Sequence, residues 1–80
     1  MRLPRDLSGD ELAHRLGQFG YAIARQKGSH MRLTTQIPSE HHVTIPRHDP
    51  LRIGTLAAVL DSVATHLAMT RNELLDAILT

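Results

Sequence analysis

The sequence contains no cysteine and no tryptophan, and it has only one tyrosine and one phenylalanine. Without cysteine there is no disulfide framework, no iron–sulfur cluster, no zinc site built on thiolates and no cysteine nucleophile. Long apolar runs are also missing, and the first residues carry acids where a signal peptide needs an apolar stretch. We therefore expect a soluble, cytoplasmic protein that does not enter a membrane.

The common catalytic motifs are missing as well. The serines form no GxSxG elbow, there is no glycine-rich phosphate loop of the GxGxxG or GxxxxGK kind, and the acidic residues are dispersed. These absences argue against triad hydrolysis, nucleotide-dependent chemistry and two-carboxylate chemistry. Six histidines remain as candidate reactive groups.

Eighty residues allow one small domain, over residues 1–80, with a single hydrophobic core. Leucine, isoleucine, valine and phenylalanine make up 21 of the 80 residues. This share lies above the roughly 20% below which chains tend to stay disordered. We expect a folded domain of marginal stability, since so short a chain buries a small fraction of its surface.

The formal net charge is only +1, but charge is unevenly distributed along the chain. Residues 21–54 carry a net charge of +3 and four of the six histidines, whereas residues 55–80 carry −2. A polyanion is the natural partner for such a middle segment. A simple solvated surface is the competing interpretation.

Three segments show the 3.6-residue apolar period of a helix packed on a core. The first begins at a capping box, Ser8–Glu11, and ends at Gly20, which we expect in the left-handed conformation. The last begins at a second capping box, Thr70–Glu73. The predicted helices cover residues 8–19, 55–67 and 70–79.

Between the first two helices the apolar period changes to two, which is typical of strands. A first strand starts at Tyr21, with Tyr21, Ile23 and Arg25 expected on one face. A hairpin turn is predicted at Lys27-Gly28, because glycine supplies the positive φ that a two-residue connection needs. The returning strand begins at His30, and a third strand spans residues 42–45.

The second and third strands alternate between apolar and polar residues. The apolar set, which the helices should cover, is Met31, Leu33, Val43 and Ile45. The polar set, which should share an open face, is His30, Arg32, Thr34, His42 and Thr44. The predicted fold is a two-layer α+β sandwich with one solvent-exposed sheet face.

His30 is the candidate reactive residue on that face, because it directly follows Gly28 and Ser29. Small residues let backbone amides approach a phosphate, and an imidazole can take a proton from a ribose 2′-hydroxyl near neutral pH. Lys27 and Arg32 flank it and are candidates for holding the phosphate. From spacing alone, the simpler interpretation of a chance surface histidine beside a glycine is favoured.

The other histidines are weaker candidates for a catalytic or metal-binding role. The doublet His41–His42 cannot readily bind one ion, because neighbouring strand residues point to opposite faces, and no carboxylate pair accompanies it or His48. We therefore expect no metal and no cofactor. Structural roles are expected for His14 and His66.

Five short motifs together resemble the HicA toxins of bacterial toxin–antitoxin pairs. They are Ser8–Leu12, Gly20-Tyr21, Arg25–His30, Val43–His48 and Leu51–Leu56. The R-Q-x-G-S-H box, followed by P-x-H and G-T-L, is far more specific than G-S-H alone.

This resemblance implies a double-stranded-RNA-binding-domain-like fold, α-β-β-β-α, over a core of residues 8–67. It also implies a ribonuclease that cleaves messenger RNA without a metal, with His30 as the catalytic residue. A HicB-like antitoxin that covers this histidine is the implied partner. Independently of the resemblance, the residues around His30 that we expect to bind the substrate phosphate are Lys27, Gly28, Ser29 and Arg32.

Two features depart from the family pattern. The helix at 70–79 is an addition that could serve as extra core, antitoxin contact or a self-association surface. The doublet His41–His42 lies outside the family motifs, and a second acid–base histidine on the open face is one interpretation of it.

Two alternatives to an enzyme remain open. One is a non-catalytic double-stranded-RNA-binding module that uses the first helix, the hairpin turn and the region of Arg52. It is disfavoured because Arg52 is the only positive charge near Gly54, where such modules carry a lysine cluster. The other is a protein-interaction subunit that neither binds RNA nor arrests growth.

Overall fold

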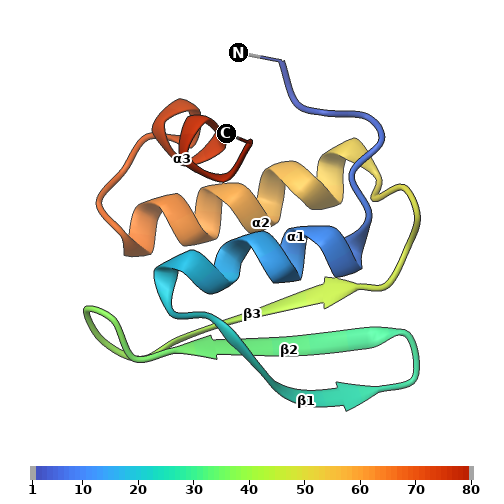
Figure 1. The fold of residues 1–80 in the computed structure, drawn as a ribbon, viewed down its shortest axis with the longest axis horizontal. Coiled ribbons are helices and arrows are strands. Elements are labelled where there is room, and N and C mark those ends of the chain that lie inside the picture. Colours follow the sequence, from blue (N-terminus) through green and yellow to red (C-terminus); the bar gives the residue numbers. More distant parts are fainter. Residues whose placement is uncertain (1, 80) are drawn as a thin grey trace.

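A computed structural model describes residues 2–79 of the chain. Three antiparallel strands form one sheet in the order β1-β2-β3, and helices cover one of its faces (Figure 1). The elements are α1 (Gly9–Leu16), the 3-10 turn η1 (Gly17–Phe19), β1 (Ala22–Lys27), β2 (His30–Thr35), β3 (His41–Pro46), α2 (Ile53–His66) and α3 (Arg71–Leu79). The predicted α+β class is confirmed, as is the order α-β-β-β-α with an additional C-terminal helix. The predicted helices agree within about two residues, although the first finishes as a 3-10 turn and α2 starts earlier than expected.

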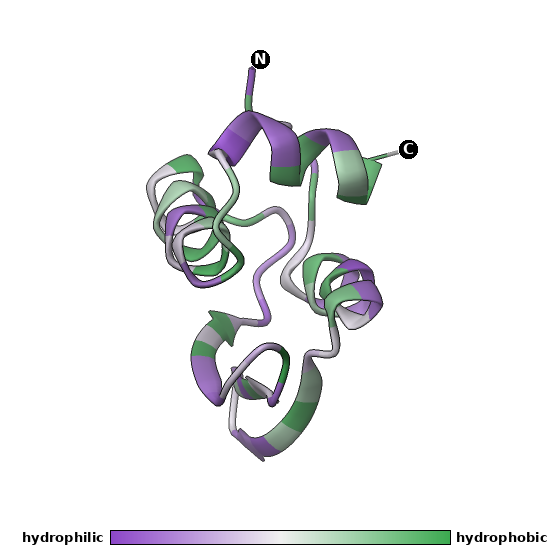
Figure 2. Ribbon diagram, turned by 90° about the vertical axis from the view of Figure 1, so that its left-hand side faces the viewer, coloured by the Kyte–Doolittle hydropathy of each residue, from purple (hydrophilic) through white to green (hydrophobic). Residues whose placement is uncertain are grey.

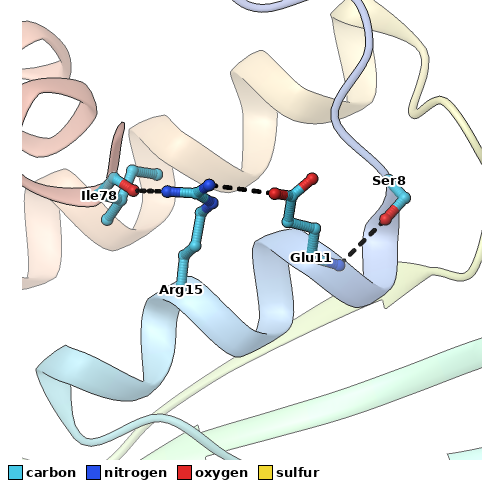
Figure 3. A network of polar contacts seen from close by, with 4 residues as sticks. All are labelled: Ser8, Glu11, Arg15 and Ile78. Atoms are coloured by element: carbon cyan, nitrogen blue, oxygen red, sulfur yellow. Dashed lines mark hydrogen bonds and ion pairs between the residues drawn. The ribbon is translucent and has the colours of Figure 1, made fainter. Parts of the chain in front are cut away.

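Of the two hydrogen bonds in the capping box predicted at the start of α1, one is formed. The backbone N–H of Glu11 donates to the Ser8 hydroxyl at 3.1 Å. The Glu11 carboxylate does not complete the capping box but accepts a hydrogen bond of 3.0 Å from Arg15, one turn later (Figure 3). Gly20 has a φ of +88°, so the left-handed end of this segment is confirmed.

The core lies between the sheet and the two helices α1 and α2. All four apolar residues predicted to face the helices are buried, with exposed fractions of 7% or less. The leucines of α1 and the Leu56–Val63 face of α2 pack against them. The opposite face of β2 and β3 carries exposed or half-exposed polar residues, and no other element covers it within residues 2–79 (Figure 1).

The additional helix α3 forms a third layer. It packs against α1 and α2 on the side away from the sheet (Figure 2). Leu74, Leu75 and Ile78 are almost fully buried there. The Arg15 guanidinium donates to the Ile78 carbonyl (Figure 3), and the Gln18 amide donates to the Ala77 carbonyl at 3.1 Å. Because carbonyls at a helix C-terminus carry partial negative charge, this contact stabilises α3 on α1.

Strand β1 differs from the predicted alternation. A register shift leaves one extra residue between Ile23, which pairs with Leu33, and Arg25, which pairs with Arg32. Leu33 faces the helices and Arg32 faces solvent, so Ile23 and Arg25 lie on opposite faces rather than on one. The expectation that they share a face is wrong because a bulge interrupts the period of two.

Among the described residues, no single helix has the length and apolarity needed to cross a membrane. α2 and α3 meet that test only when taken as a pair, bent by 102°.

Candidate functional site

The connection between β1 and β2 is a two-residue turn, Gly28-Ser29. Lys27 is the last residue of β1 and pairs directly with His30, so the predicted turn at Lys27-Gly28 is displaced by one residue. Gly28 has a φ of +58°, the left-handed conformation that such a tight hairpin needs. Because directly paired residues project their side chains to the same face, Lys27 stands beside His30.

His30 lies at the turn end of the open face, where positive charge is concentrated. It is exposed, as are its partner Lys27 and its neighbour Arg32, two residues further along β2. The two-residue turn also sets Arg25 opposite Arg32, which adds a third cation to the same face. Within residues 2–79, the side chains of these three cations form no hydrogen bond or ion pair. They remain available for an anionic ligand.

Sequence reasoning did not include Arg25 among the site residues. With a Gly28-Ser29 turn, regular antiparallel pairing places Lys27 opposite His30 and Arg25 opposite Arg32, and the bulge lies beyond Arg25, toward Ile23. The position of the hairpin turn was therefore the signal that could have identified Arg25.

The Gly28-Ser29 turn is held in place by a hydrogen bond from the segment that follows β3. The backbone N–H of Arg47 donates to the Ser29 carbonyl at 2.6 Å. The Arg47 guanidinium binds both oxygens of Asp10, at 2.8 and 3.0 Å. Hydrogen bonding to Arg47 is the main reason that the pKa of Asp10 is lowered. Arg47 is thus a structural cation, whereas the cations around His30 are unpaired.

The first turn of α1 approaches the end of β3 closely at Gly9. A Cβ atom added there would lie 2.0 Å from the Pro46 carbonyl oxygen. The Gly9 N–H donates to the His48 carbonyl at 2.9 Å. The S-G-D-E, G-S-H and P-R-H motifs, which are distant in sequence, therefore meet at one end of the sheet.

The far end of the open face is occupied by a second histidine. Thr34 pairs with His42 and Arg32 pairs with Thr44, so the five residues predicted for this face do share it. His42 Nε2 lies 2.8 Å from Glu40 Oε2, and His42 Nδ1 lies 2.7 Å from Thr34 Oγ1. Its side chain is 36% exposed.

His41 lies on the helix-covered side, as expected from its alternation with His42. Its ring is stacked on His66 with centroids 4.4 Å apart, and it forms hydrogen bonds with the Tyr21 hydroxyl at 2.6 Å and with Ser62 at 3.2 Å. Burial lowers the pKa of His41, and the nearby His66 and His42 add to the effect. Burial raises the pKa of Tyr21 to about 12. These contacts give His41 a structural role.

The remaining histidines, His14, His48 and His66, lie outside the open sheet face. His66 Nε2 donates to the Ile37 carbonyl at 3.2 Å, which supports the structural role expected for it. His14 is exposed on α1, and His48 is exposed in the loop after β3. Within the part of the chain that the structure describes, no three histidine, aspartate or glutamate side chains are grouped so as to hold a metal ion.

Comparison with known protein families gives a match. The model of a protein family described as the HicA toxin of bacterial toxin–antitoxin matches residues 9–63. The matched stretch runs from the start of α1 into α2 and includes the hairpin, His30 and the P-R-H segment, while α3 lies outside it. No curated protein and no solved structure matches the chain.

Proposed function

This chain belongs to the HicA toxin family of bacterial toxin–antitoxin systems, and we propose that it acts as an endoribonuclease with His30 as its catalytic residue. The family match establishes the role of toxin. The observation that carries the catalytic proposal is the exposed imidazole of His30, standing among three unpaired cations on an uncovered sheet face. An RNA backbone is a polyanion whose 2′-hydroxyl needs only a base to become a nucleophile.

In the proposed reaction the neutral imidazole of His30 takes the proton of a ribose 2′-hydroxyl. The 2′-oxygen attacks the adjacent phosphorus in line, and the bond from phosphorus to the 5′-oxygen breaks. The products are a 2′,3′-cyclic phosphate and a 5′-hydroxyl, whose oxygen takes a proton from solvent. The imidazolium then returns its proton to water, so no metal and no cofactor take part in any step.

The neighbours of His30 have complementary roles in this proposal. Lys27 and Arg32 bind the phosphate oxygens and offset the negative charge that builds up on them in the transition state. Gly28 and Ser29 let the RNA backbone approach the turn closely, because neither carries a bulky side chain. Arg25 joins them as a further phosphate contact.

A toxin of this family has an antitoxin partner. We propose that this partner is a HicB-like protein that covers the face bearing His30 and so prevents RNA from reaching it. A neighbouring reading frame that encodes such a protein would support the pairing.

The test compares wild type, His30→Ala and His14→Ala by induced expression and by cleavage of RNA with the purified proteins. Because His30 is exposed, its replacement should leave the fold intact, as circular dichroism will check. We expect cleavage to fall by at least about 10²- to 10⁴-fold and growth arrest to disappear. The exposed His14 on α1 serves as the control, and its variant should behave as wild type.

Other outcomes separate the competing functions. Full cleavage by a folded His30→Ala protein rules out the assignment. RNA binding by the wild type without any cleavage indicates the double-stranded-RNA-binding module instead. Loss of cleavage in EDTA that returns with added divalent metal contradicts the metal-independent mechanism.

A further inference from the structure

The imidazole of His42 is held at both of its nitrogens. Its Nε2 donates to the Glu40 carboxylate at 2.8 Å, since a carboxylate only accepts, and its Nδ1 shares a 2.7 Å hydrogen bond with the Thr34 hydroxyl. Neither nitrogen is left to exchange a proton with a substrate. His42 is therefore poorly suited to be a second acid–base residue, and what it presents to solvent is the face of a fixed, flat ring.

The charges around His42 do not favour a phosphate. The Glu40 side chain is 62% exposed, and its carboxylate lies directly against the ring. The three unpaired cations lie further along the same face: Lys27 is the cross-strand partner of His30 at the opposite end, and Arg25 and Arg32 are cross-strand partners midway. A polyanionic chain that crosses this face should place a phosphate at His30 and an uncharged group at His42.

An apolar hollow borders His42 at the free edge of β3. It has a volume of about 290 Å³ and lies between β3 and α2, where Val43, Ala58 and Val59 contribute to its lining. Apolar surface beside an exposed imidazole face suits a flat, weakly polar ring. Nucleobases have this character, and they stack on aromatic side chains in many single-stranded RNA complexes.

The distance from His30 is long enough to separate a phosphate site from a base site further along the same strand. Thr34, the cross-strand partner of His42, lies four residues along β2 from His30, a rise of about 13 Å. Arg32 and Thr44 lie between the two ends on the same face. A single RNA strand can follow this line for a few nucleotides without leaving the sheet.

We propose that His42, oriented by Glu40 and Thr34, is a nucleobase-binding platform on which one base of the RNA substrate stacks while a phosphate further along the same strand is held at His30. The proposal rests on the RNA cleavage proposed above and assigns His42 to substrate positioning. The platform helps to set which phosphate reaches His30.

The test measures binding of short fluorescein-labelled single-stranded oligoribonucleotides to the His30→Ala toxin, which leaves them uncut. Adding His42→Ala should weaken binding roughly 5- to 150-fold, the usual range for removing one base–aromatic stack. His42→Phe keeps a flat ring without nitrogens and should bind within a few-fold of the parent. His14→Ala, a change at an exposed histidine on α1, on the helix side of the sheet, is the control.

A second measurement locates the base. In a series of oligonucleotides with one abasic position moved along the chain, one position should weaken binding to the parent and have no such effect in His42→Ala. With His30 intact, His42→Ala should raise KM more than it lowers kcat. A purely structural role would not produce coupling between one base and one side chain.

Three results would overturn the platform. His42→Phe could lose as much affinity as His42→Ala, the abasic losses could be equal in both proteins, or His42→Ala could weaken only antitoxin binding, which would make this end of the face a protein contact. Cleavage by the wild type is measured separately, so failure of the platform is distinguishable from failure of the ribonuclease proposal.

Discussion

Arg47 and Asp10 form a two-point ion pair, with distances of 2.8 and 3.0 Å, between the segment after β3 and the first turn of α1. The backbone of Arg47 holds the Ser29 carbonyl, so this pair also anchors the turn that precedes His30. A second two-point pair, Arg71 with Asp61, joins α3 to α2 far from that turn. The two pairs are chemically alike but differ in what they position.

We expect Asp10→Asn to reduce RNA cleavage and Asp61→Asn to leave it unchanged. The first substitution loosens the segment that holds the turn at His30, and the second does not touch it. Cleavage rates at saturating RNA, with circular dichroism to check folding, test the contrast. Equal activity of the two variants would show that the ion pair does not position the turn.

The stability of the Asp10→Asn and Asp61→Asn variants should depend on pH in the same way. Hydrogen bonding to arginine lowers the pKa of both Asp10 and Asp61 in the folded protein. The stabilisation is therefore complete above the unfolded pKa of about 3.9 and is lost as pH falls through the folded value. Urea midpoints measured from pH 6 to pH 2 should fall less steeply in each variant than in wild type. An unchanged slope would contradict the assignment.

Acid should also act through His41, at higher pH. Its folded pKa is lowered, mainly by burial, so the fold favours the neutral ring stacked on His66. The free energy of unfolding should be largest above the unfolded pKa of about 6.5 and decline as pH falls below it. His41→Asn should flatten this decline in urea titrations, whereas His14→Asn should not. If the free energy of unfolding declines as steeply in His41→Asn as in wild type, another titrating group causes the decline.

Substitutions at Arg25 and Arg52 distinguish two candidate RNA-binding surfaces, the open sheet face and the start of α2. Both are exposed, but Arg25 lies opposite Arg32 on the open face and Arg52 lies at the start of α2. Arg25→Gln should weaken binding to all RNA sequences and reduce the slope of log affinity against log salt by about 0.7. Salt titrations of RNA binding measure it. A reduced slope in Arg52→Gln alone would favour the double-stranded-RNA-binding module.

Gly9 and Gly54 offer a matched pair of glycine substitutions near two helix starts. A Cβ at Gly9 would collide with the Pro46 carbonyl, whereas a Cβ at Gly54 meets nothing within 4 Å. Gly9→Ala should lower the free energy of unfolding by about 1–3 kcal/mol or more, the usual effect of overpacking. Gly54→Ala should raise it by about 0.5–1 kcal/mol, since alanine favours a helix. Urea unfolding compares them, and a neutral Gly9→Ala would refute the close approach.

The elements of this fold follow from local patterns. Ser8 and Thr70 begin helices because each accepts a hydrogen bond from the N–H three residues later, a contact contained in four consecutive residues. Alternation places His30 opposite in facing to Met31, whichever way the sheet packs. The position of His30 on an open face and the α+β class were therefore predictable.

Features that depend on contacts between distant segments were not predictable. Glu11 turns to Arg15 instead of completing its capping box, and Arg15 in turn reaches the end of α3. The turn lies at Gly28-Ser29 because the strand register, and not glycine alone, decides which residues pair. Local propensity does not contain this information.

The sequence by itself determined the helices, the strands, the exposed histidine after the turn and the family, because capping, periodicity and short motifs act over a few residues. Only the tertiary structure decided that Arg25 joins the cations beside His30, that Arg47 is paired with Asp10, and that His42 is held at both nitrogens. These three depend on the register set by the Gly28-Ser29 turn, on the meeting of α1 with the end of β3, and on the pairing of β2 with β3. Each depends on how separate segments of the chain meet, which capping and periodicity within one segment do not specify.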